Sequence, residues 1–108
     1  MVCRMWRGWA AGANALLYDR YLKEDLFPRL AATIAGQGYL GYQILTRQIG
    51  EETEFTTLVW FDSLASIKAF SGEGFERAVV TDKAAALLSR WEPLASHHAL
   101  SGASAGPL

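Results

Sequence analysis

The sequence predicts an α+β domain of ferredoxin-like topology, in which one antiparallel sheet carries helices on one face. Three observations lead to this fold class. The chain has 108 residues, of which 51% are hydrophobic and 19% charged, and this suits a single packed domain. Its segments run in the order strand, helix, strand, strand, helix or helices, strand. The third strand is apolar on both faces, so both of its faces are expected to be buried.

Charge and cysteine content narrow the class of protein. The formal net charge is −1 and no basic stripe occurs, which argues against a nucleic-acid partner. No apolar run approaches the roughly 20 residues that cross a bilayer, so no membrane association is expected. The first twelve residues lack the apolar core of a signal peptide, and the single cysteine, Cys3, excludes an internal disulfide. Together these features predict a cytoplasmic protein.

The first two elements are a strand and a helix. Residues 2–9 are short and rich in bulky alternating side chains, which predicts a strand with Trp6 and Trp9 on opposite faces. Residues 15–35 carry apolar side chains every three or four positions, as an amphipathic helix does. Pro28 predicts a kink in this helix, or an end to it and the start of a second one.

Two strands follow and form a hairpin. Residues 39–48 and 54–61 have strand composition, and the glycine and acids of residues 49–53 suit the connection. The two faces of the third strand are Phe55, Thr57, Val59 and Phe61 on one side, and Thr56, Leu58 and Trp60 on the other. We therefore expect helices against one face and a second sheet against the other.

A short helix comes next over residues 64–70. Asp62 or Ser63 is expected to cap its first turn, because side-chain oxygens there accept from free backbone N–H groups. Gly72 is expected to end it, because glycine adopts the left-handed conformation common after helices.

The last third of the chain is predicted to be helical and then extended. Residues 75–90 suggest two helical pieces, and residues 94–100 a weaker fourth strand. Residues 1–100 would form one domain, followed by a flexible tail over residues 101–108. Because one face of such a sheet stays open, we expect two copies to pack sheet to sheet as a homodimer.

A strand that ends in Trp, a Ser-capped helix and a closing strand with a His pair follow one another in EFTTLVWFDSLASIKAFSGEGFERAVV and LLSRWEPLASHHAL. In these features the chain resembles the antibiotic biosynthesis monooxygenase-like proteins of the dimeric α+β barrel superfamily. The opening RMWRGW and the helix with LYDRYL fit the same pattern. The resemblance covers residues 2–100 and implies a ferredoxin-like fold within a dimeric α+β barrel. This superfamily hosts unrelated activities.

The resemblance also implies a candidate substrate site. Some relatives oxidise polycyclic phenols or anthrones with molecular oxygen and no cofactor, in a pocket between the sheet and the helices. Their strand Trp matches Trp60, and an Asn four residues earlier falls on Thr56, which offers a hydroxyl instead of the amide. A Tyr of these relatives falls on Ser66 and an Arg near Val80, so one of the four positions is kept. Thr56, Trp60 and Ser66 are therefore candidate substrate-binding residues.

Two further aromatic residues are candidate substrate contacts. Haem-degrading relatives have a Trp where this chain has Phe70 and a haem-ligating His where it has Val79. The resemblance thus argues against haem degradation and keeps Phe70 as a contact for an aromatic substrate. The hydroxyl of Tyr39, on the second predicted strand, could hold a phenol or ketone oxygen. A place at the barrel rim or the dimer edge is the alternative for Tyr39.

Trp60 has two interpretations that the sequence leaves open. Its indole can orient a planar substrate by stacking, or it can lock the helix over residues 64–70 onto the sheet as a core residue. The two roles can coexist.

His97 and His98 are adjacent on a predicted strand and point to opposite faces, so they cannot together chelate one metal ion. Which of the two faces the pocket is left open. The resemblance matches His97 to a family histidine, which makes it the best candidate for proton transfer. Cys3 could approach either histidine from the first strand, but a small buried filler is the favoured interpretation. No metal site is predicted.

The sequence contains no P-loop, GxGxxG, CxxC, HExxH or GxSxG motif. An enzyme of this kind would depend on a substrate that supplies most of the reactivity, as in cofactor-free oxygenation. The leading hypothesis is a cofactor-independent monooxygenase that oxidises a planar aromatic or polyketide-like molecule with O2, with Trp60 and His97 as catalytic residues. The alternatives are a non-catalytic dimeric barrel that binds a small apolar metabolite, and a non-oxidative isomerase, cyclase or decarboxylase with the same pocket.

Overall fold

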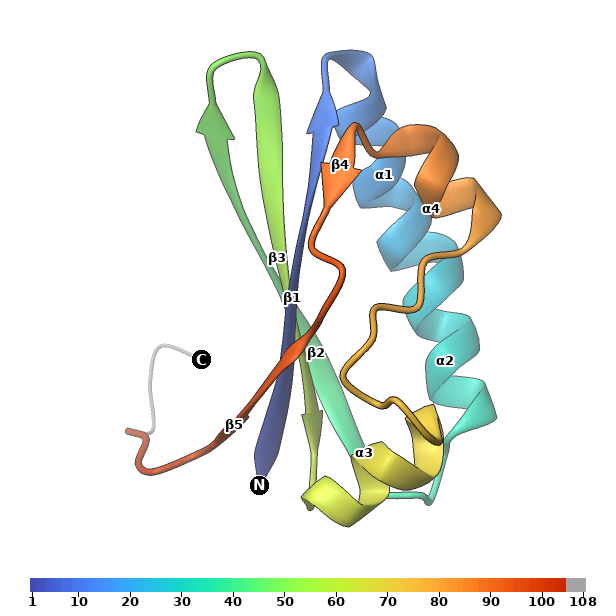
Figure 1. Cartoon of the computed structure of the whole chain (residues 1–108), viewed down its shortest axis with the longest axis vertical. Coiled ribbons are helices and arrows are strands. Elements are labelled where there is room, and N and C mark those ends of the chain that lie inside the picture. Colours follow the sequence, from blue (N-terminus) through green and yellow to red (C-terminus); the bar gives the residue numbers. More distant parts are fainter. Residues whose placement is uncertain (105–108) are drawn as a thin grey trace.

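A computed structural model describes residues 1–104, which form an antiparallel sheet with helices against one face (Figure 1). The sheet order is β2-β3-β1, and two short strands, β4 and β5, pair antiparallel with the free edge of β1. The strands are β1 (Val2–Ala11), β2 (Tyr39–Ile49), β3 (Glu52–Phe61), β4 (Arg90–Trp91) and β5 (Ser96–Ala99). This topology confirms the predicted α+β ferredoxin-like fold.

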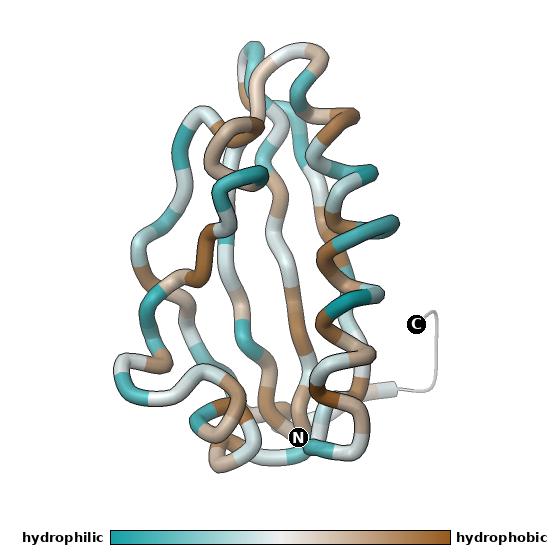
Figure 2. Tube along the Cα trace, turned by 90° about the vertical axis from the view of Figure 1, so that its right-hand side faces the viewer, coloured by the Kyte–Doolittle hydropathy of each residue, from teal (hydrophilic) through white to brown (hydrophobic). Residues whose placement is uncertain are grey.

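The first helical region is one rod of three segments, α1 (Ala13–Tyr21), the π-helix η1 (Leu22–Leu26) and α2 (Phe27–Thr33). The backbone N–H of Phe27 donates to the carbonyl of Leu22, five residues earlier, which is the π-helical spacing. Pro28, which has no N–H to donate to the preceding turn, follows at once in the first turn of α2. The predicted interruption near Pro28 therefore takes the form of a wide helical turn. Figure 2 shows hydrophobic and hydrophilic residues alternating along this rod.

The helix α3 (Leu64–Ser71) begins and ends as the sequence predicts. The Ser63 hydroxyl accepts a hydrogen bond from the backbone N–H of Ser66 at 3.2 Å, so Ser63 is the cap. Gly72 ends the helix with φ of 70°, in the region that favours glycine.

The segment over residues 75–80 is not helical, which corrects the predicted first helical piece. The second piece is helical only over α4 (Asp82–Leu87), because the chain turns into the strand β4 at Arg90. Long-range backbone hydrogen bonds hold the segment extended. The N–H of Ala78 donates to the carbonyl of Pro93 at 2.9 Å, and that of Ala95 to the carbonyl of Glu76 at 2.7 Å. These bonds use groups that a helix would have paired internally.

The core lies on the helix-facing side of the sheet. Strand β3 contributes Phe55, Thr57, Val59 and Phe61, and β1 contributes Arg4, Trp6 and Ala10. The opposite side of the sheet carries no helix among residues 1–104 (Figure 1). The residues that alternation and strand register place on this open face include Cys3, Met5, Leu45, Thr56, Leu58 and Trp60, with Arg7, Trp9, Gln43, Arg47 and Glu54 beside them.

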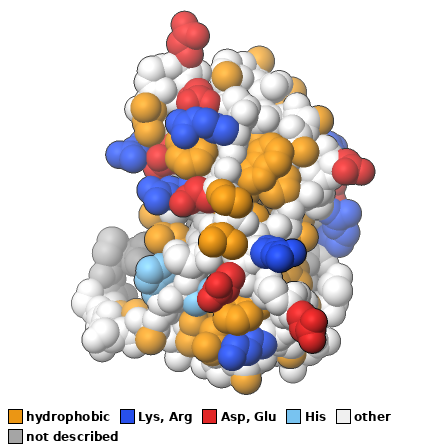
Figure 3. Space-filling model, in the orientation of Figure 1, with side chains coloured by type: hydrophobic (Ala, Val, Ile, Leu, Met, Phe, Trp, Pro, Cys, Tyr) orange, Lys and Arg blue, Asp and Glu red, His pale blue; other side chains and the backbone are white. Residues whose placement is uncertain are grey.

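Trp6 and Trp9 lie on opposite faces of β1, as predicted: Trp6 packs against the core, while Trp9 lies under the guanidinium of Arg90 at 4.0 Å. On the side that Figure 3 shows, charges of both signs are intermingled. No helix within residues 1–104 is long and apolar enough to span a bilayer. The predicted tail starts at residues 101–104, which form no helix or strand, and its last four residues lie outside the described chain.

Candidate active site

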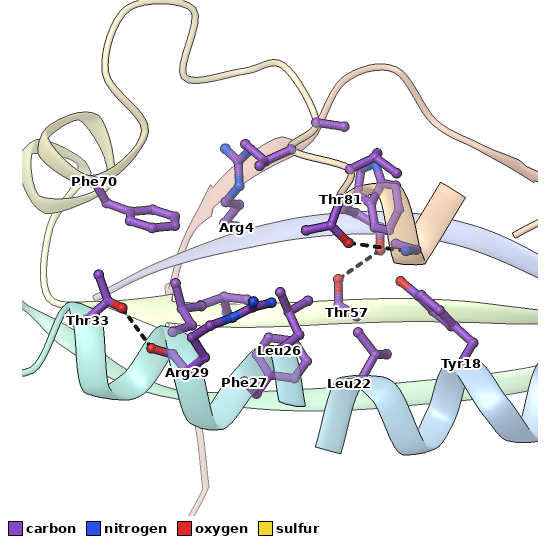
Figure 4. A pocket seen from close by; sticks show the side chains of 17 residues that line it. Arg4, Tyr18, Leu22, Leu26, Phe27, Arg29, Thr33, Thr57, Phe70 and Thr81 are labelled. Carbon is purple, nitrogen blue, oxygen red and sulfur yellow. Dashed lines mark hydrogen bonds between the residues drawn. The ribbon is translucent and has the colours of Figure 1, made fainter. Parts of the chain in front are cut away.

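A cavity of about 400 Å³ lies between the sheet and the helices (Figure 4). Its floor comes from β1 and β3, one wall from the α1–η1–α2 rod, and the other from the segment between α3 and α4. The volume is within the range of small-molecule sites. The aromatic and aliphatic side chains that line it include Trp6, Tyr18, Leu22, Leu26, Phe27, Leu30, Val59, Phe70, Val79 and Val80.

The helical rod is irregular where it borders the cavity. Leu22 and Leu26, the first and last residues of η1, both line it. Single π turns inside helices recur at functional sites, and this one adds a residue to the turn that faces the cavity. Pro28 marks the same place in the sequence.

Arg4 brings a buried positive charge to the cavity. It points from β1 toward the helix side, lines the cavity and is only 9% exposed. Its guanidinium donates to the backbone carbonyls of Phe75 and Arg77, the latter at 2.8 Å. Burial lowers the pKa of Arg4, although a guanidinium keeps its proton in proteins. Arg4 thus joins the sheet to the extended segment that walls the cavity.

His97 is a second polar group, next to Arg4. Its Nε2 lies 3.0 Å from Nη1 of Arg4. A guanidinium only donates, so Nε2 accepts and the imidazole is neutral, with its proton on Nδ1. Burial lowers the pKa of His97, and the Arg4 charge lowers it further. The Phe75 ring packs beside the imidazole, with 5.0 Å between ring centres.

Hydroxyls and a second arginine complete the polar part of the cavity. The Tyr21 and Thr81 hydroxyls hydrogen-bond at 2.7 Å and tie the helical rod to the N-terminus of α4. Arg29 lines the cavity from α2 but is largely exposed, and its guanidinium lies 3.6 Å from the Asp25 carboxylate. In Figure 4, Arg4 on β1 and Arg29 on α2 lie on different sides of the cavity.

Two of the predicted site residues lie at this cavity. Phe70 lines it from α3, and His97 stands behind Arg4. The structure therefore also decides which histidine faces the helix side: His97 pairs with Arg4 across the strands, while His98 pairs with Cys3. The interaction of Nε2 with Arg4 leaves His97 without a free basic nitrogen.

The other predicted site residues lie elsewhere. Trp60 and Thr56 are on the open face, and the Trp60 indole N–H donates to the side-chain oxygen of Gln43 at 3.1 Å. Ser66 is in the first turn of α3, where its hydroxyl donates to Asp62. Tyr39 packs edge-on against Phe61, and burial raises the pKa of its phenol. None of these four side chains lines the cavity within residues 1–104.

Arg4, Trp6 and Thr57 line the cavity but were not singled out from the sequence. A signal for Arg4 was present, because Arg4 falls on the same face of the first strand as Trp6. A charged residue on an apolar strand face is unusual enough to mark a site.

Cys3 is buried on the open-face side of β1, and burial raises the pKa of its thiol. In the described part of the chain, no group of three or more His, Cys, Asp and Glu side chains could hold a metal ion.

The fold matches a known structure, while the sequence matches none of the compared families. No protein-family model matches the chain, and no curated protein matches it. A crystal structure from Bacillus cereus, described as a "putative antibiotic biosynthesis monooxygenase", superposes with a TM-score of 0.62. The match covers 99% of this chain and 97% of that one, at 8% sequence identity. This likeness establishes a shared fold for the single chain, and it confirms the ferredoxin-like fold that the sequence resemblance implies.

Proposed function

We propose that this chain is a cofactor-independent monooxygenase that oxidises a planar aromatic or polyketide-like molecule with O2. The reaction would take place in the cavity between the sheet and the helices. The observation that carries the proposal is the cavity itself: it is about 400 Å³ in volume, is lined mainly by apolar and aromatic side chains, and has the buried cation Arg4 in its floor. The fold shared with the Bacillus cereus protein supports the same class of reaction.

The chemistry suits a site that offers few reactive groups. An anthrone that gives up a proton to water becomes an electron-rich anion, which transfers an electron to O2. The resulting radical and superoxide combine into a peroxide anion, which takes a proton back from water to become a hydroperoxide and then loses water to give the quinone. In sum, C14H10O and O2 yield C14H8O2 and H2O, so one oxygen atom enters the product and one leaves as water. The protein would contribute orientation, a dry site and stabilisation of the anion.

Named residues supply these contributions. Phe70 and Trp6 offer aromatic faces against which a planar ring can pack. His97 would act through Arg4, by accepting a hydrogen bond that fixes the direction of the guanidinium. In this proposal Trp60 and Thr56 lie on the open face and do not contact the substrate.

Oxygen uptake by the purified protein tests the proposal. With anthrone, chelator and no added cofactor, we expect uptake above the spontaneous rate and one anthraquinone formed per O2 consumed. Consumption of the substrate under nitrogen would instead indicate a non-oxidative isomerase or cyclase. Binding of anthrone without uptake above the spontaneous rate would indicate a non-catalytic barrel.

We also propose that a second copy of the chain covers the open face and forms a dimeric α+β barrel. Leu45 lies within this face, opposite Thr56, and is 54% exposed. Leu58 and Met5 are opposite one another on the same face. Apolar side chains grouped on an uncovered sheet face favour association. Ion pairs border this group, including Arg47 with Glu54 at 2.9 Å, and would form the polar rim of the interface.

A further inference from the structure

We infer that the cavity binds its ligand as an anion, with the Arg4 guanidinium as the counter-ion. The ligand class is a planar aromatic molecule that carries a carboxylate or an ionised phenol or enol. The inference relies on the proposed function only in taking this cavity as the ligand site.

The guanidinium of Arg4 has donors to spare. It carries five N–H groups, and its hydrogen-bond partners within residues 1–104 are the Phe75 carbonyl, the Arg77 carbonyl and His97. These three bonds involve Nη1 and Nη2 only, so Nε–H has no hydrogen-bond partner in that part of the chain. Because Arg4 lines the cavity, a ligand oxygen there can accept from the remaining N–H groups.

No protein charge balances Arg4. All three partners are neutral, and no Asp or Glu of residues 1–104 forms an ion pair with it. Burial is the cause that shifts its pKa, with no opposing pull from a carboxylate. A buried charge without a partner is costly, and charges in protein interiors are usually paired. A bound anion would supply the missing charge and recover part of this cost.

The other charged residue that lines the cavity is also positive. Two arginines, Arg4 and Arg29, line the cavity, and none of the lining residues in the described chain is acidic. Arg29 stands at the exposed side, where its partner Asp25 is 3.6 Å away and lies outside the lining. An incoming anion would thus first meet Arg29, whose charge is partly neutralised by Asp25, and then Arg4 in the interior, whose charge has no carboxylate partner.

Arg4 also has a purely structural interpretation, because its bonds to Phe75 and Arg77 anchor the extended segment. That role alone would need no charge, since a neutral donor could satisfy both carbonyls. It also predicts no preference between an anionic and a neutral ligand of equal shape. The two interpretations therefore differ in ligand binding by the unmodified protein.

The test compares naphthalene-2-carboxylate with naphthalene-2-carboxamide at pH 7.5 by calorimetric titration of the full chain. The two probes have the same rings and nearly the same shape, and they differ in charge. We expect the carboxylate to bind about tenfold more tightly or better, because hydrogen bonds to charged groups are the stronger ones. In Arg4→Gln the preference should fall to about twofold or less, and Arg4→Lys should keep part of it. Arg20→Gln is the control, because Arg20 is exposed and away from the cavity.

Equal affinity for the two probes in the unmodified protein, or no binding of the carboxylate, would overturn the inference. A preference that survives in Arg4→Gln would overturn it too. If Arg4→Gln does not fold, the unmodified protein and Arg4→Lys still decide. Neither probe reacts with O2, so their binding tests the anion site alone. A carboxylate preference in this titration, together with no anthrone-dependent oxygen uptake above the spontaneous rate, would refute the proposed oxygenase and leave the anion site standing.

Discussion

At the scale of single residues, the contact between Arg4 and His97 connects charge to structure. The imidazole accepts from a permanently charged guanidinium, so only its neutral form fits this position. Both the desolvation of the ring and the neighbouring positive charge favour that form, and both lower the pKa of His97. Protonation of His97 would break the hydrogen bond and place two cations side by side.

This contact predicts a loss of stability in mild acid. The folded-state pKa of His97 lies below the ordinary value of about 6.5. The stabilisation from the neutral ring is therefore complete above that value and is lost as the pH falls below it. Urea unfolding between pH 5 and 8 should show this loss in the unmodified protein and a flatter profile in His97→Gln, whose amide oxygen can still accept from Arg4. His98→Gln should keep the slope of the unmodified protein. Parallel profiles for the unmodified protein and His97→Gln would contradict this account.

At the scale of elements, the sequence predicted those helix ends and irregularities that depend on contacts between neighbouring residues. The cap at Ser63, the end at Gly72 and the irregularity before Pro28 depend on residues next to one another in the chain. The segment over residues 75–80 was predicted wrongly as a helix, because its backbone is paired with residues 93–95 and with Arg4. Those partners are brought together only by the fold.

The faces of the third strand show the same limit. Alternation correctly placed Phe55 and Trp60 on opposite faces of the strand. Both faces are largely apolar, so the pattern does not indicate which face packs against the helices. The resemblance assigned Trp60 and Thr56 to a substrate pocket, whereas the structure places both on the open face. Of the residues that the sequence singled out, Phe70 lines the cavity and His97 contacts Arg4, whereas Arg4 itself was not singled out.

The cap of α3 gives a prediction at this scale. Ser63→Ala removes the acceptor for the Ser66 N–H and should lower the free energy of unfolding by about 1 kcal/mol. Ser63→Thr keeps a hydroxyl at the cap and should recover most of the loss. Urea denaturation of the three proteins measures the difference, and an unchanged midpoint in Ser63→Ala would show that the cap adds nothing.

At the scale of the whole molecule, the two faces of the sheet have different uses in this account. The helix side holds the cavity, and the open face holds the proposed contact with a second copy. A substrate site that opens between the sheet and the helices would remain accessible in such a dimer.

The dimer predicts a specific effect of charge on the open face. Leu45→Glu places a carboxylate where the second sheet would pack, so it should shift the protein to a monomer at micromolar concentration. Leu16→Glu is a matched control, because Leu16 is 59% exposed on α1, on the helix side. Size-exclusion chromatography with light scattering reports the mass of each. A monomeric unmodified protein, or a Leu45→Glu protein that remains a dimer, would refute the interface.

The central claim is that the reaction takes place on the helix side of the sheet, and one measurement tests it most directly. Anthrone-dependent oxygen uptake should be compared in the unmodified protein, Val80→Trp and Trp60→Phe, each checked for an unchanged fold by circular dichroism. Val80 lines the cavity, so the larger side chain should fill it and abolish uptake, whereas Trp60→Phe on the open face should keep most of it. Loss of uptake in Trp60→Phe, with activity intact in Val80→Trp, would contradict the account and place the chemistry on the open face.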